Sequence, residues 1–310
     1  MGKMAFVFPG QGAQYAGMGK DFYEKYPVSR AVFEKASAVS GLDLPALCFE
    51  KNDKLDVTEY TQIAMLTVEA AILAAVKEAD IRPDVSAGLS LGEYGALLVS
   101  GALAREDAFR VVRKRGIYMQ KAVPAGGAMT AVIGMEGKEV EKVCKDTEGQ
   151  VSVANYNCPG QVVITGEEDA VRNVGKMLKE MGARRVIPLK VSGPFHSEML
   201  SGAGQKLESV LEEIKIREIQ IPYLTNVTAD YVTERAQVKE LLVRQVFSPV
   251  KWQQSVERMI EDGVDAFLEI GPGKTLTGFL KKINKNVAGY HIENTEDFEK
   301  LLYVLRGERC

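Results

Sequence analysis

The hydrophobic positions of the chain follow two patterns, short continuous runs and longer stripes at helical spacing. Runs such as residues 4–8 and 264–270 predict buried strands, whereas the stripes at residues 61–78 and 105–122 predict helices, the first of them strongly amphipathic. Strands that alternate with helices of about ten or more residues predict an α/β domain with a mostly parallel, doubly wound sheet. The same patterns predict further helices at residues 21–40, 199–214, 238–247, 253–262 and 275–282, a strand at residues 219–226, and a final strand and helix.

The middle of the chain has a different order of elements. Strands are expected at residues 129–134, 151–155, 161–166 and 185–191, and helices at residues 138–146 and 167–181. This order, β-α-β-β-α-β, is the ferredoxin-like plan. We therefore predict that residues 125–194 form a small inserted subdomain, and that residues 1–124 and 195–310 form a larger one. Residues 155–160 are expected to form the hairpin turn of the small subdomain, with side chains that face a cleft.

Composition and charge exclude several classes of protein. A hydrophobic content of 46% and a charged content of 26% are typical of a soluble globular protein, and a net charge of −3 gives no general reason to expect nucleic-acid binding. Neither a signal peptide nor an apolar run as long as a membrane span is evident. The four cysteines, Cys48, Cys144, Cys158 and Cys310, form no C-x-x-C pair. We therefore expect a cytoplasmic protein with neither a metal site nor a disulfide framework.

A short stretch of small residues is the first candidate for chemistry. Gly88, Ser90 and Gly92 have the spacing of a nucleophile elbow, in which a serine lies on a sharp turn between a strand and a helix. On such a turn the serine hydroxyl lies near the first N–H groups of the helix, which favour negative charge. The spacing alone leaves an ordinary glycine-rich turn as the alternative.

If Ser90 needs an imidazole base, the chain offers only two histidines. His196 follows Gly193 and Pro194 at the predicted junction of the two subdomains and precedes a helix, which is a position suited to a cleft. His291 has the apolar neighbours of a strand, which favours a structural role. We predict that His196 is the base.

Arg115 has an unusual position on its predicted helix. Most basic side chains of residues 105–122 gather on one face, but Arg115 lies on the apolar stripe, between Val112 and Met119. A cation on a core-facing stripe needs an anionic partner, or its side chain must extend to the surface. The sequence leaves both alternatives open.

The glycine-rich loop at residues 9–14 follows the first strand and invites comparison with nucleotide-binding loops. The dinucleotide fingerprint requires a third glycine where Tyr15 stands, and the phosphate-binding loop requires Gly-Lys-Ser/Thr where Gly17 and Met18 begin. Both interpretations therefore fail. What remains is either a surface turn or a loop that presents Gln11 as a neutral hydrogen-bond donor.

Four segments taken together, residues 8–14, 88–94, 115–120 and 193–197, resemble the bacterial malonyl-CoA:acyl carrier protein transacylases. Further matching segments are residues 60–62, 155–161, 243–245 and 269–274. The resemblance extends from about residue 4 to the last helix and so covers essentially the whole chain. It implies an α/β-hydrolase-like large subdomain with a mostly parallel sheet, together with an inserted ferredoxin-like small subdomain.

The resemblance also implies which groups perform the chemistry. Ser90 would be the nucleophile and His196 the base. The backbone N–H groups of Gln11 and Leu91 would form the oxyanion hole, which replaces the side-chain role first considered for Gln11. The backbone carbonyl of Gln245 would orient the imidazole.

Other residues would bind the substrate. Arg115 would hold the malonyl carboxylate, and the substrate cleft would be lined by Gln62, Met119, Asn157 and Phe195. Phe195 precedes the histidine as in the malonyl-selective form of this motif, which favours malonyl over methylmalonyl.

The match has one departure. The family usually carries a histidine where this chain has Leu89, directly before Ser90. Because His196 is the implied base, activation of the serine should survive, but a polar contact in the cleft should be lost.

The implied activity is transfer of a malonyl group from coenzyme A to the phosphopantetheine thiol of acyl carrier protein, through a malonyl-serine intermediate, in fatty-acid biosynthesis. No metal or other cofactor is required, since the coenzyme A thioester is itself the substrate. We expect a monomer. Carrier proteins of this pathway are acidic, so docking would need a local basic patch, for which the candidates are Arg113, Lys114, Lys190 and Lys251.

Three alternatives remain open at the level of sequence. A serine hydrolase of the same architecture would use Ser90 and His196 but gives no reason for Arg115. A polyketide-type acyltransferase with another extender unit would differ mainly near Phe195. A non-catalytic adaptor for carrier proteins would not need the serine, the histidine and the arginine together.

Overall fold

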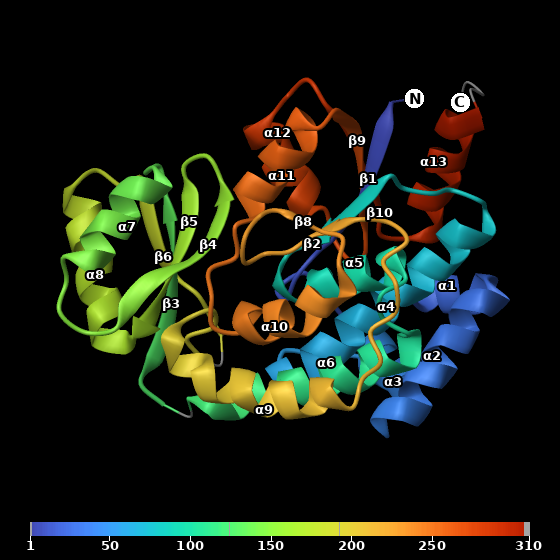
Figure 1. Cartoon of the computed structure of the whole chain (residues 1–310), viewed down its shortest axis with the longest axis horizontal. Helices are drawn as coiled ribbons and strands as arrows, with labels where there is room; N and C mark the ends of the chain where they lie inside the picture. Colours follow the sequence, from blue (N-terminus) through green and yellow to red (C-terminus); the bar gives the residue numbers. More distant parts are fainter. Residues whose placement is uncertain (1, 124, 192, 307–310) are drawn as a thin grey trace.

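The computed structural model describes residues 2–123, 125–191 and 193–306. Pro124, where the sequence places the first subdomain boundary, and Cys310 lie outside the described residues. The described strands form two separate sheets, one of six strands and one of four. Figure 1 shows the four-stranded sheet and its helices on the left and the larger unit on the right. The limits of the two subdomains stay a prediction.

The six-stranded sheet is mostly parallel, as the sequence predicts. Its strands are β1 (Lys3–Phe8), β2 (Val85–Gly88), β7 (Tyr223–Leu224), β8 (Tyr231–Val232), β9 (Val264–Ile270) and β10 (Ala288–Ile292). They lie in the order β10-β9-β1-β2-β7-β8, and β7–β8 is the antiparallel pair. Phe8 lies beside Gly88 at the carboxyl ends of β1 and β2, so the loops after these two strands meet at one edge of the sheet.

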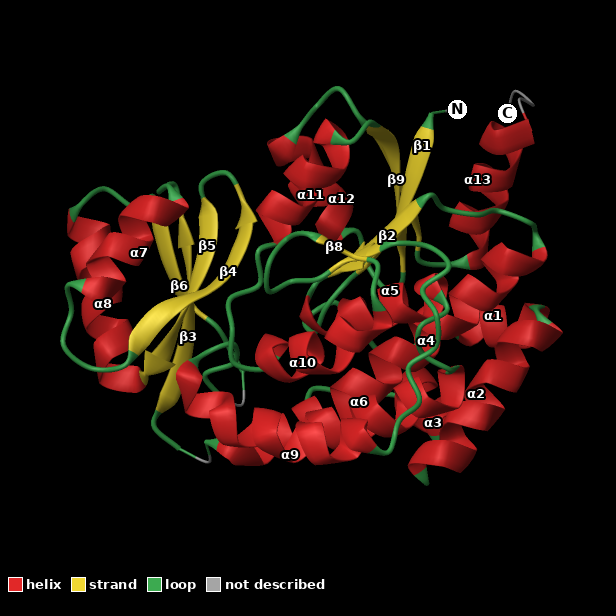
Figure 2. Ribbon diagram, viewed as in Figure 1, coloured by secondary structure: helices red, strands yellow, loops and turns green. Residues whose placement is uncertain are grey.

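Alternate residues of β1 pack on opposite faces of this sheet. Phe6 and Phe8 belong to a buried cluster with side chains of α2, α4, α5 and α6, whereas Ala5 and Val7 belong to a second cluster with side chains of α11 and α12. Figure 2 shows these helices on the two sides of the sheet, which is the doubly wound arrangement. The helices of the larger unit are α1 (Lys20–Lys25), α2 (Pro27–Ser40), α3 (Leu44–Phe49), α4 (Thr58–Glu78), α5 (Glu93–Ser100), α6 (Arg105–Ala122), α9 (Ser201–Glu212), α10 (Arg235–Gln245), α11 (Trp252–Glu261), α12 (Thr275–Ile283) and α13 (Thr295–Arg306).

Helix α4 is buried almost all round, so the prediction of an amphipathic helix is wrong. Even its polar side chains Gln62, Thr67 and Glu69 are buried, because α4 packs against α2 and α6 and also contacts α5 and β9. By length and composition α4 could cross a membrane, which also corrects the expectation that no segment reaches that length. However, 89% of its apolar window is buried inside the protein, and the core helix of a globular protein meets the same criteria.

The single helix predicted at residues 21–40 is two helices. Helix α1 ends at Lys25 and α2 begins at Pro27, and Tyr26 between them has an extended backbone with φ −112° and ψ 114°. Proline has no N–H group to continue a helix and disfavours a helical conformation in the residue before it. The break therefore lies where the sequence itself requires one.

The four-stranded sheet has the predicted ferredoxin-like order. Strands β3 (Gly127–Ile133), β4 (Val151–Cys158), β5 (Gln161–Glu167) and β6 (Arg185–Pro188) alternate with α7 (Gly137–Lys145) and α8 (Glu168–Glu180). The strands pair antiparallel in the order β4-β5-β3-β6. Backbone hydrogen bonds between Val250 and β4 tie this sheet to the larger unit, at 2.8 Å to Ala154 O and 2.9 Å from Tyr156 N.

Three boundaries differ from those predicted. The hairpin turn expected at residues 155–160 is shorter, because β4 continues through Asn155 and Asn157 and leaves the turn to Pro159 and Gly160. Strand β6 ends at a proline, which cannot donate to the next rung of the sheet. The strand expected at residues 219–226 is reduced to the two residues of β7.

Candidate active site

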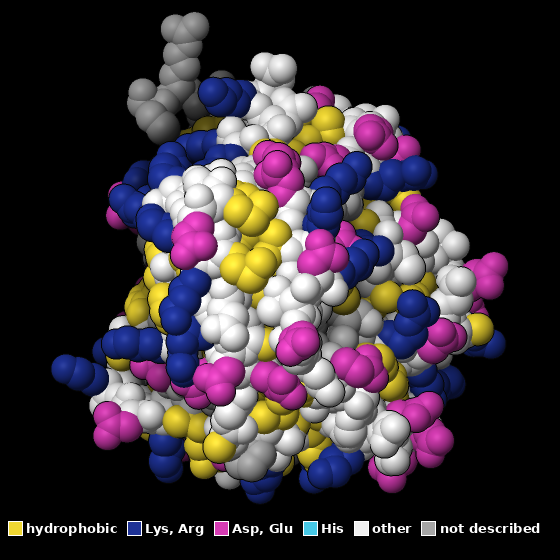
Figure 3. Space-filling view, turned by 90° about the vertical axis from the view of Figure 1, so that its left-hand side faces the viewer, with side chains coloured by type: hydrophobic (Ala, Val, Ile, Leu, Met, Phe, Trp, Pro, Cys, Tyr) yellow, Lys and Arg dark blue, Asp and Glu magenta, His cyan; other side chains and the backbone are white. Residues whose placement is uncertain are grey.

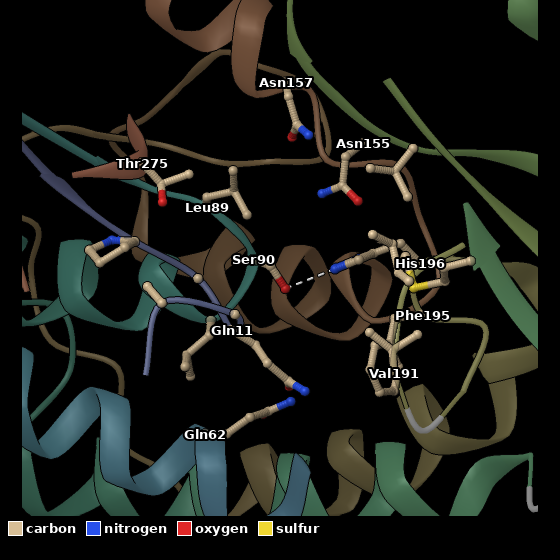
Figure 4. Close-up of a pocket in the computed structure, with 18 of the residues that line it drawn as sticks. Gln11, Gln62, Leu89, Ser90, Asn155, Asn157, Val191, Phe195, His196 and Thr275 are labelled. Carbon is tan, nitrogen blue, oxygen red and sulfur yellow. Dashed lines mark hydrogen bonds between the residues drawn. The ribbon is translucent and has the colours of Figure 1, made fainter. Parts of the chain in front are cut away.

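A cavity of about 240 Å³ lies between the two sheets. Its walls come from the loops after β1 and β2, from helices α4, α6 and α12, and from strands β3, β4 and β5. Figure 4 shows Ser90 and His196 facing each other in this cavity, with Asn155 and Asn157 on one side and Gln62 on the other. The lining includes every predicted site residue except Gln245, namely Gln11, Gln62, Ser90, Leu91, Arg115, Met119, Asn157, Phe195 and His196.

The turn at Ser90 has the geometry of a nucleophile elbow. Ser90 has a φ of 53°, in the left-handed region that non-glycine residues rarely adopt. A Cβ atom on Gly88 would lie 2.0 Å from the backbone of Gly92, and a Cβ atom on Gly92 would lie 2.1 Å from the carbonyl oxygen of Phe8. Only glycine fits at these two positions, so the spacing of the motif follows from close packing of the turn against β1.

Ser90, His196 and Gln245 form a continuous chain of hydrogen bonds. Ser90 Oγ lies 2.8 Å from His196 Nε2, and His196 Nδ1 lies 2.9 Å from the backbone carbonyl oxygen of Gln245. Because a carbonyl oxygen can only accept, Nδ1 carries the proton and Nε2 is free to accept one from the serine. The histidine also has a positive φ of 59°, which holds its ring at the junction of the two units.

The imidazole is held in its neutral form. His196 is buried, and burial together with the nearby Arg115 guanidinium lowers its pKa to about 4. Hydrogen bonds to the backbone at Gln245 and Ser248 oppose this shift only in part. At neutral pH the ring is therefore an available proton acceptor.

Arg115 is buried with only 1% of its surface exposed, so its side chain does not extend to the surface. Its Nη1 group donates to Gln62 Oε1 at 2.7 Å, and its Nη2 group donates to Gln245 Oε1 at 2.9 Å and to Ser90 Oγ at 3.2 Å. Its Nε–H group is buried without a hydrogen-bond partner among the described residues. The guanidinium is thus fixed beside Ser90 by neutral oxygens, and of its five N–H groups the Nε–H and one on Nη1 are left without a hydrogen bond among the described residues.

Two buried residues that the sequence analysis missed support the turn. Asn226 Oδ1 accepts from the Ser90 N–H group at 2.6 Å, and its Nδ2 group donates to the carbonyl oxygen of Gly88 at 2.7 Å. Glu93 Oε2 accepts from the Asn226 N–H group at 3.0 Å and from Gln245 Nε2 at 2.8 Å. Glu93 stands directly after the elbow motif, but no local signal connects Asn226 to a serine more than a hundred positions away.

The walls around this centre are partly those predicted. The side chain of Gln11 donates to Thr58 Oγ1 at 3.0 Å, so its side-chain N–H is engaged there. Leu89 lines the cavity and packs tightly on the loop after β1, since a Cβ atom on Gly10 would lie 2.7 Å from Leu89 O. Lining residues that the sequence analysis did not single out are Met129, Val163, Leu189, Val191, Thr275, Leu276 and Phe279.

The other histidine lies elsewhere. His291 is on β10, outside the cavity lining, with Nε2 3.5 Å from Asp297 Oδ2. Within residues 2–123, 125–191 and 193–306, no group of three or more His, Cys, Asp or Glu side chains could hold a metal ion. In the same residues Cys48, Cys144 and Cys158 are buried and unpaired.

Comparisons with known proteins agree with this site. The acyl transferase domain family matches residues 5–305. The malonyl CoA-acyl carrier protein transacylase of Bacillus subtilis is 45% identical over 313 residues, which cover 99% of each protein. The crystal structure of malonyl CoA-acyl carrier protein transacylase from Clostridium perfringens superposes with a TM-score of 0.95 at 44% identity, over 98% of each chain. A malonyl-transacylase in complex with its type II PKS acyl-carrier protein has a TM-score of 0.94 at 40% identity, over 99% of this chain and 100% of that one.

These similarities extend over nearly the whole chain, including both sheets and the helices between them. They confirm the resemblance that the sequence segments indicated, and they confirm the fold class of a mostly parallel sheet with a separate antiparallel one. The chain therefore belongs to the acyl transferase domain family, among the malonyl CoA-acyl carrier protein transacylases.

Proposed function

We propose that this chain transfers a malonyl group from coenzyme A to the phosphopantetheine thiol of acyl carrier protein, through a malonyl-Ser90 intermediate, in fatty-acid biosynthesis. The observation that carries the proposal is one cavity with both a serine–histidine pair at 2.8 Å and the buried Arg115. The pair supports acyl transfer, and the buried cation supports an acyl group that brings its own carboxylate. The names of the relatives from Bacillus subtilis and Clostridium perfringens support the same substrate pair.

In the first half-reaction, His196 Nε2 accepts the hydroxyl proton of Ser90 while the serine oxygen attacks the thioester carbonyl carbon. The backbone N–H groups of Gln11 and Leu91 would stabilise the tetrahedral oxyanion, and one such donor contributes about 3–4 kcal/mol. The carbon–sulfur bond then breaks, coenzyme A leaves as a thiol with the proton from the imidazole, and malonyl-Ser90 remains.

In the second half-reaction, the carrier's thiol enters the same cavity and gives its proton to His196 as its sulfur attacks the ester carbon. The bond to Ser90 Oγ breaks, and the serine oxygen takes the proton back. Two half-reactions that share one site follow a ping-pong course. The steps use protein groups and two thiols, so they require no metal or redox cofactor.

Arg115 separates this proposal from a serine hydrolase. A guanidinium offers a planar pair of donors that suits a carboxylate, and its Nε–H group lacks a partner among the described residues. Gln62 and Gln245 hold the guanidinium in place without charge of their own. A hydrolase that acts on neutral esters would gain nothing from a cation buried at this position.

Other residues would decide which acyl groups fit. We propose that Phe195 and Met119 restrict the cavity to an unbranched malonyl unit, and that Asn157 lines the path of the pantetheine arm. Leu89 supplies an apolar wall where the family usually has a polar one. The enzyme would act as a cytoplasmic monomer, with residues 125–194 as the inserted subdomain.

Carrier docking would use basic side chains near the mouth of the cavity. Of the four candidates, Arg113 is held by Glu59 through bonds of 2.6 and 3.1 Å, and Lys251 is half-buried. Lys190 is exposed between Leu189 and Val191, which line the cavity. Figure 3 shows Lys and Arg side chains along the left edge of one face, and further basic side chains mixed with acidic ones over the rest of it.

The nucleophile is tested by mass. Brief exposure of the protein to malonyl-CoA should add one malonyl group, located by peptide mapping at Ser90, because this hydroxyl lies within hydrogen-bond distance of the neutral imidazole. Ser90→Ala should abolish the added mass. Labelling at another residue, or labelling that persists in the variant, contradicts the assignment.

The base is tested with both histidines. His196→Ala should lower the rate of malonyl transfer by at least about 10²-fold, a typical contribution of a general base. His291→Ala, outside the cavity, is the matched control and should change stability rather than rate. Equal kinetic losses in the two variants would show that the base is misassigned.

The role of Arg115 is tested with two thioesters. A hydrogen bond to a charged group contributes about 1.5–3 kcal/mol, so loss of two should slow malonyl transfer at least about 10²-fold in Arg115→Ala. Acetyl transfer should be unchanged or faster, because acetyl-CoA has no carboxylate. Arg110→Ala, an exposed arginine on the same helix, is the control. If both thioesters lose activity equally in Arg115→Ala, the arginine has only a structural role.

Docking is tested with charge reversal and salt. Lys190→Glu should slow transfer to the carrier more than self-acylation from malonyl-CoA, and Lys138→Glu, exposed on α7, should slow neither. Exposed ion pairs weaken as salt screens them, so in the unmodified enzyme transfer to the carrier should fall more steeply with ionic strength than self-acylation. Identical salt dependence of the two half-reactions would contradict docking of the carrier through exposed basic side chains.

A further inference from the structure

Glu93 is a buried carboxyl group behind the active site that the proposed mechanism leaves without a role. It is the first residue of α5 and is fully buried. Its Oε2 atom accepts hydrogen bonds from Gln245 Nε2 at 2.8 Å and from the Asn226 N–H group at 3.0 Å. Among the described residues it makes no ion pair, although the buried cation Arg115 is near enough to lower its pKa in part.

One amide group connects this carboxyl to the cation. Gln245 donates through Nε2 to Glu93 and accepts through Oε1 from Arg115 Nη2 at 2.9 Å. The same Nε2 group also donates to the Ser90 carbonyl oxygen at 2.8 Å, which fixes the amide in this orientation. Glu93 is therefore joined to Arg115 through a neutral amide bridge, and it lies outside the lining of the cavity.

We propose that Glu93 is a positioning residue that sets how tightly the cavity binds the substrate carboxylate, because its ionised form offsets the charge of Arg115 and its protonated form does not. The inference rests on the proposed role of Arg115. It adds a specific control of affinity for acyl groups that carry a carboxylate.

The physical reason is the balance of charge in a cavity shielded from water. With Glu93 protonated, the buried network carries the single positive charge of Arg115. With Glu93 ionised, the charges of Arg115 and Glu93 cancel. An arriving carboxylate is then attracted by Arg115 and repelled by Glu93. Charges interact more strongly in such an interior than in water, so this second carboxylate is felt across the amide bridge.

Among Glu93 and the ionisable groups that face it, Glu93 is the one whose pKa lies near neutral pH. Burial raises the pKa of Glu93 to about 7, although its hydrogen bonds and Arg115 on α6 lower it in part. Burial also raises the pKa of Tyr94 on the same helix and of Tyr223 on β7, so both phenols stay neutral. The remaining contacts come from the Gln245 amide on α10 and, in the segment after β7, from the Thr225 hydroxyl and the Asn226 backbone N–H, all of them neutral.

The sign of the effect follows from this pKa. Below it Glu93 is protonated, Arg115 is unbalanced, and affinity for the malonyl carboxylate is high. As pH rises through about 7, ionisation of Glu93 weakens that affinity. His196, with a pKa of about 4, stays neutral over the same range and does not contribute.

The test is the pH dependence of KM for acylation of Ser90 by two thioesters. Between about pH 6 and about pH 8.5, KM for malonyl-CoA should rise by about tenfold, the effect of a coupling of one pKa unit, while kcat stays constant. Acetyl-CoA carries the same phosphates but no carboxylate, so its KM should not share this rise. This comparison needs no variant, and a malonyl KM that varies no more than the acetyl KM overturns the proposal.

Variants locate the titrating group. Glu93→Gln keeps an oxygen acceptor for Gln245 and Asn226, so it should hold KM for malonyl-CoA at the low value at every pH. Glu69→Gln, a second fully buried carboxyl on α4, should keep the dependence of the unmodified enzyme. Persistence of the dependence in Glu93→Gln overturns the proposal. If Arg115→Ala leaves the ratio of malonyl to acetyl transfer unchanged, the proposed role of Arg115 itself is wrong. That result is distinct from a pH dependence that persists in Glu93→Gln, which overturns only the role of Glu93.

Discussion

Burial of the Arg115 guanidinium is the constraint on which the rest of the cavity depends. A cation removed from water is costly unless its N–H groups find acceptors. Here the acceptors are Gln62 Oε1, Gln245 Oε1 and Ser90 Oγ, all of them neutral oxygens. The N–H groups of Arg115 thus largely have acceptors, but among the described residues no carboxylate makes an ion pair with the guanidinium. This arrangement supports our proposal that the substrate supplies the missing carboxylate.

Ser90, the proposed nucleophile, is placed by close packing of the backbone rather than by hydrogen bonds alone. The register that sets Phe8 beside Gly88 brings the loop after β1 against the elbow, and Gly92 fits there because it lacks a Cβ atom. Ser90 and His196 both have a positive φ, a strained conformation that the surrounding contacts must hold. Two strained residues that meet at 2.8 Å are typical of a site preorganised for a reaction.

Sequence predicted the parts of this protein that have local signals. The elbow spacing gave Ser90, the phase of α6 singled out Arg115, and the order of elements indicated the inserted sheet. The break at Pro27 also had a local signal, which the apolar pattern of residues 21–40 concealed. Asn226 could not be predicted, because its contact with Ser90 joins segments 136 positions apart. Helix α4 was misjudged since its polar side chains are buried by helices that only the tertiary fold brings together.

The neutral partner of His196 is consistent with the same charge constraint. In a serine–histidine–aspartate triad, a carboxylate accepts the Nδ1–H bond and stabilises the imidazolium. Arg115 is near enough to lower the pKa of His196, so a carboxylate at that position would compete for the cation that we propose the substrate needs. The backbone carbonyl of Gln245 orients the imidazole without adding charge, while the side chain of the same residue holds Arg115. One glutamine thus supports both the proposed base and the proposed carboxylate site, and the carboxyl group of Glu93 lies one amide further away.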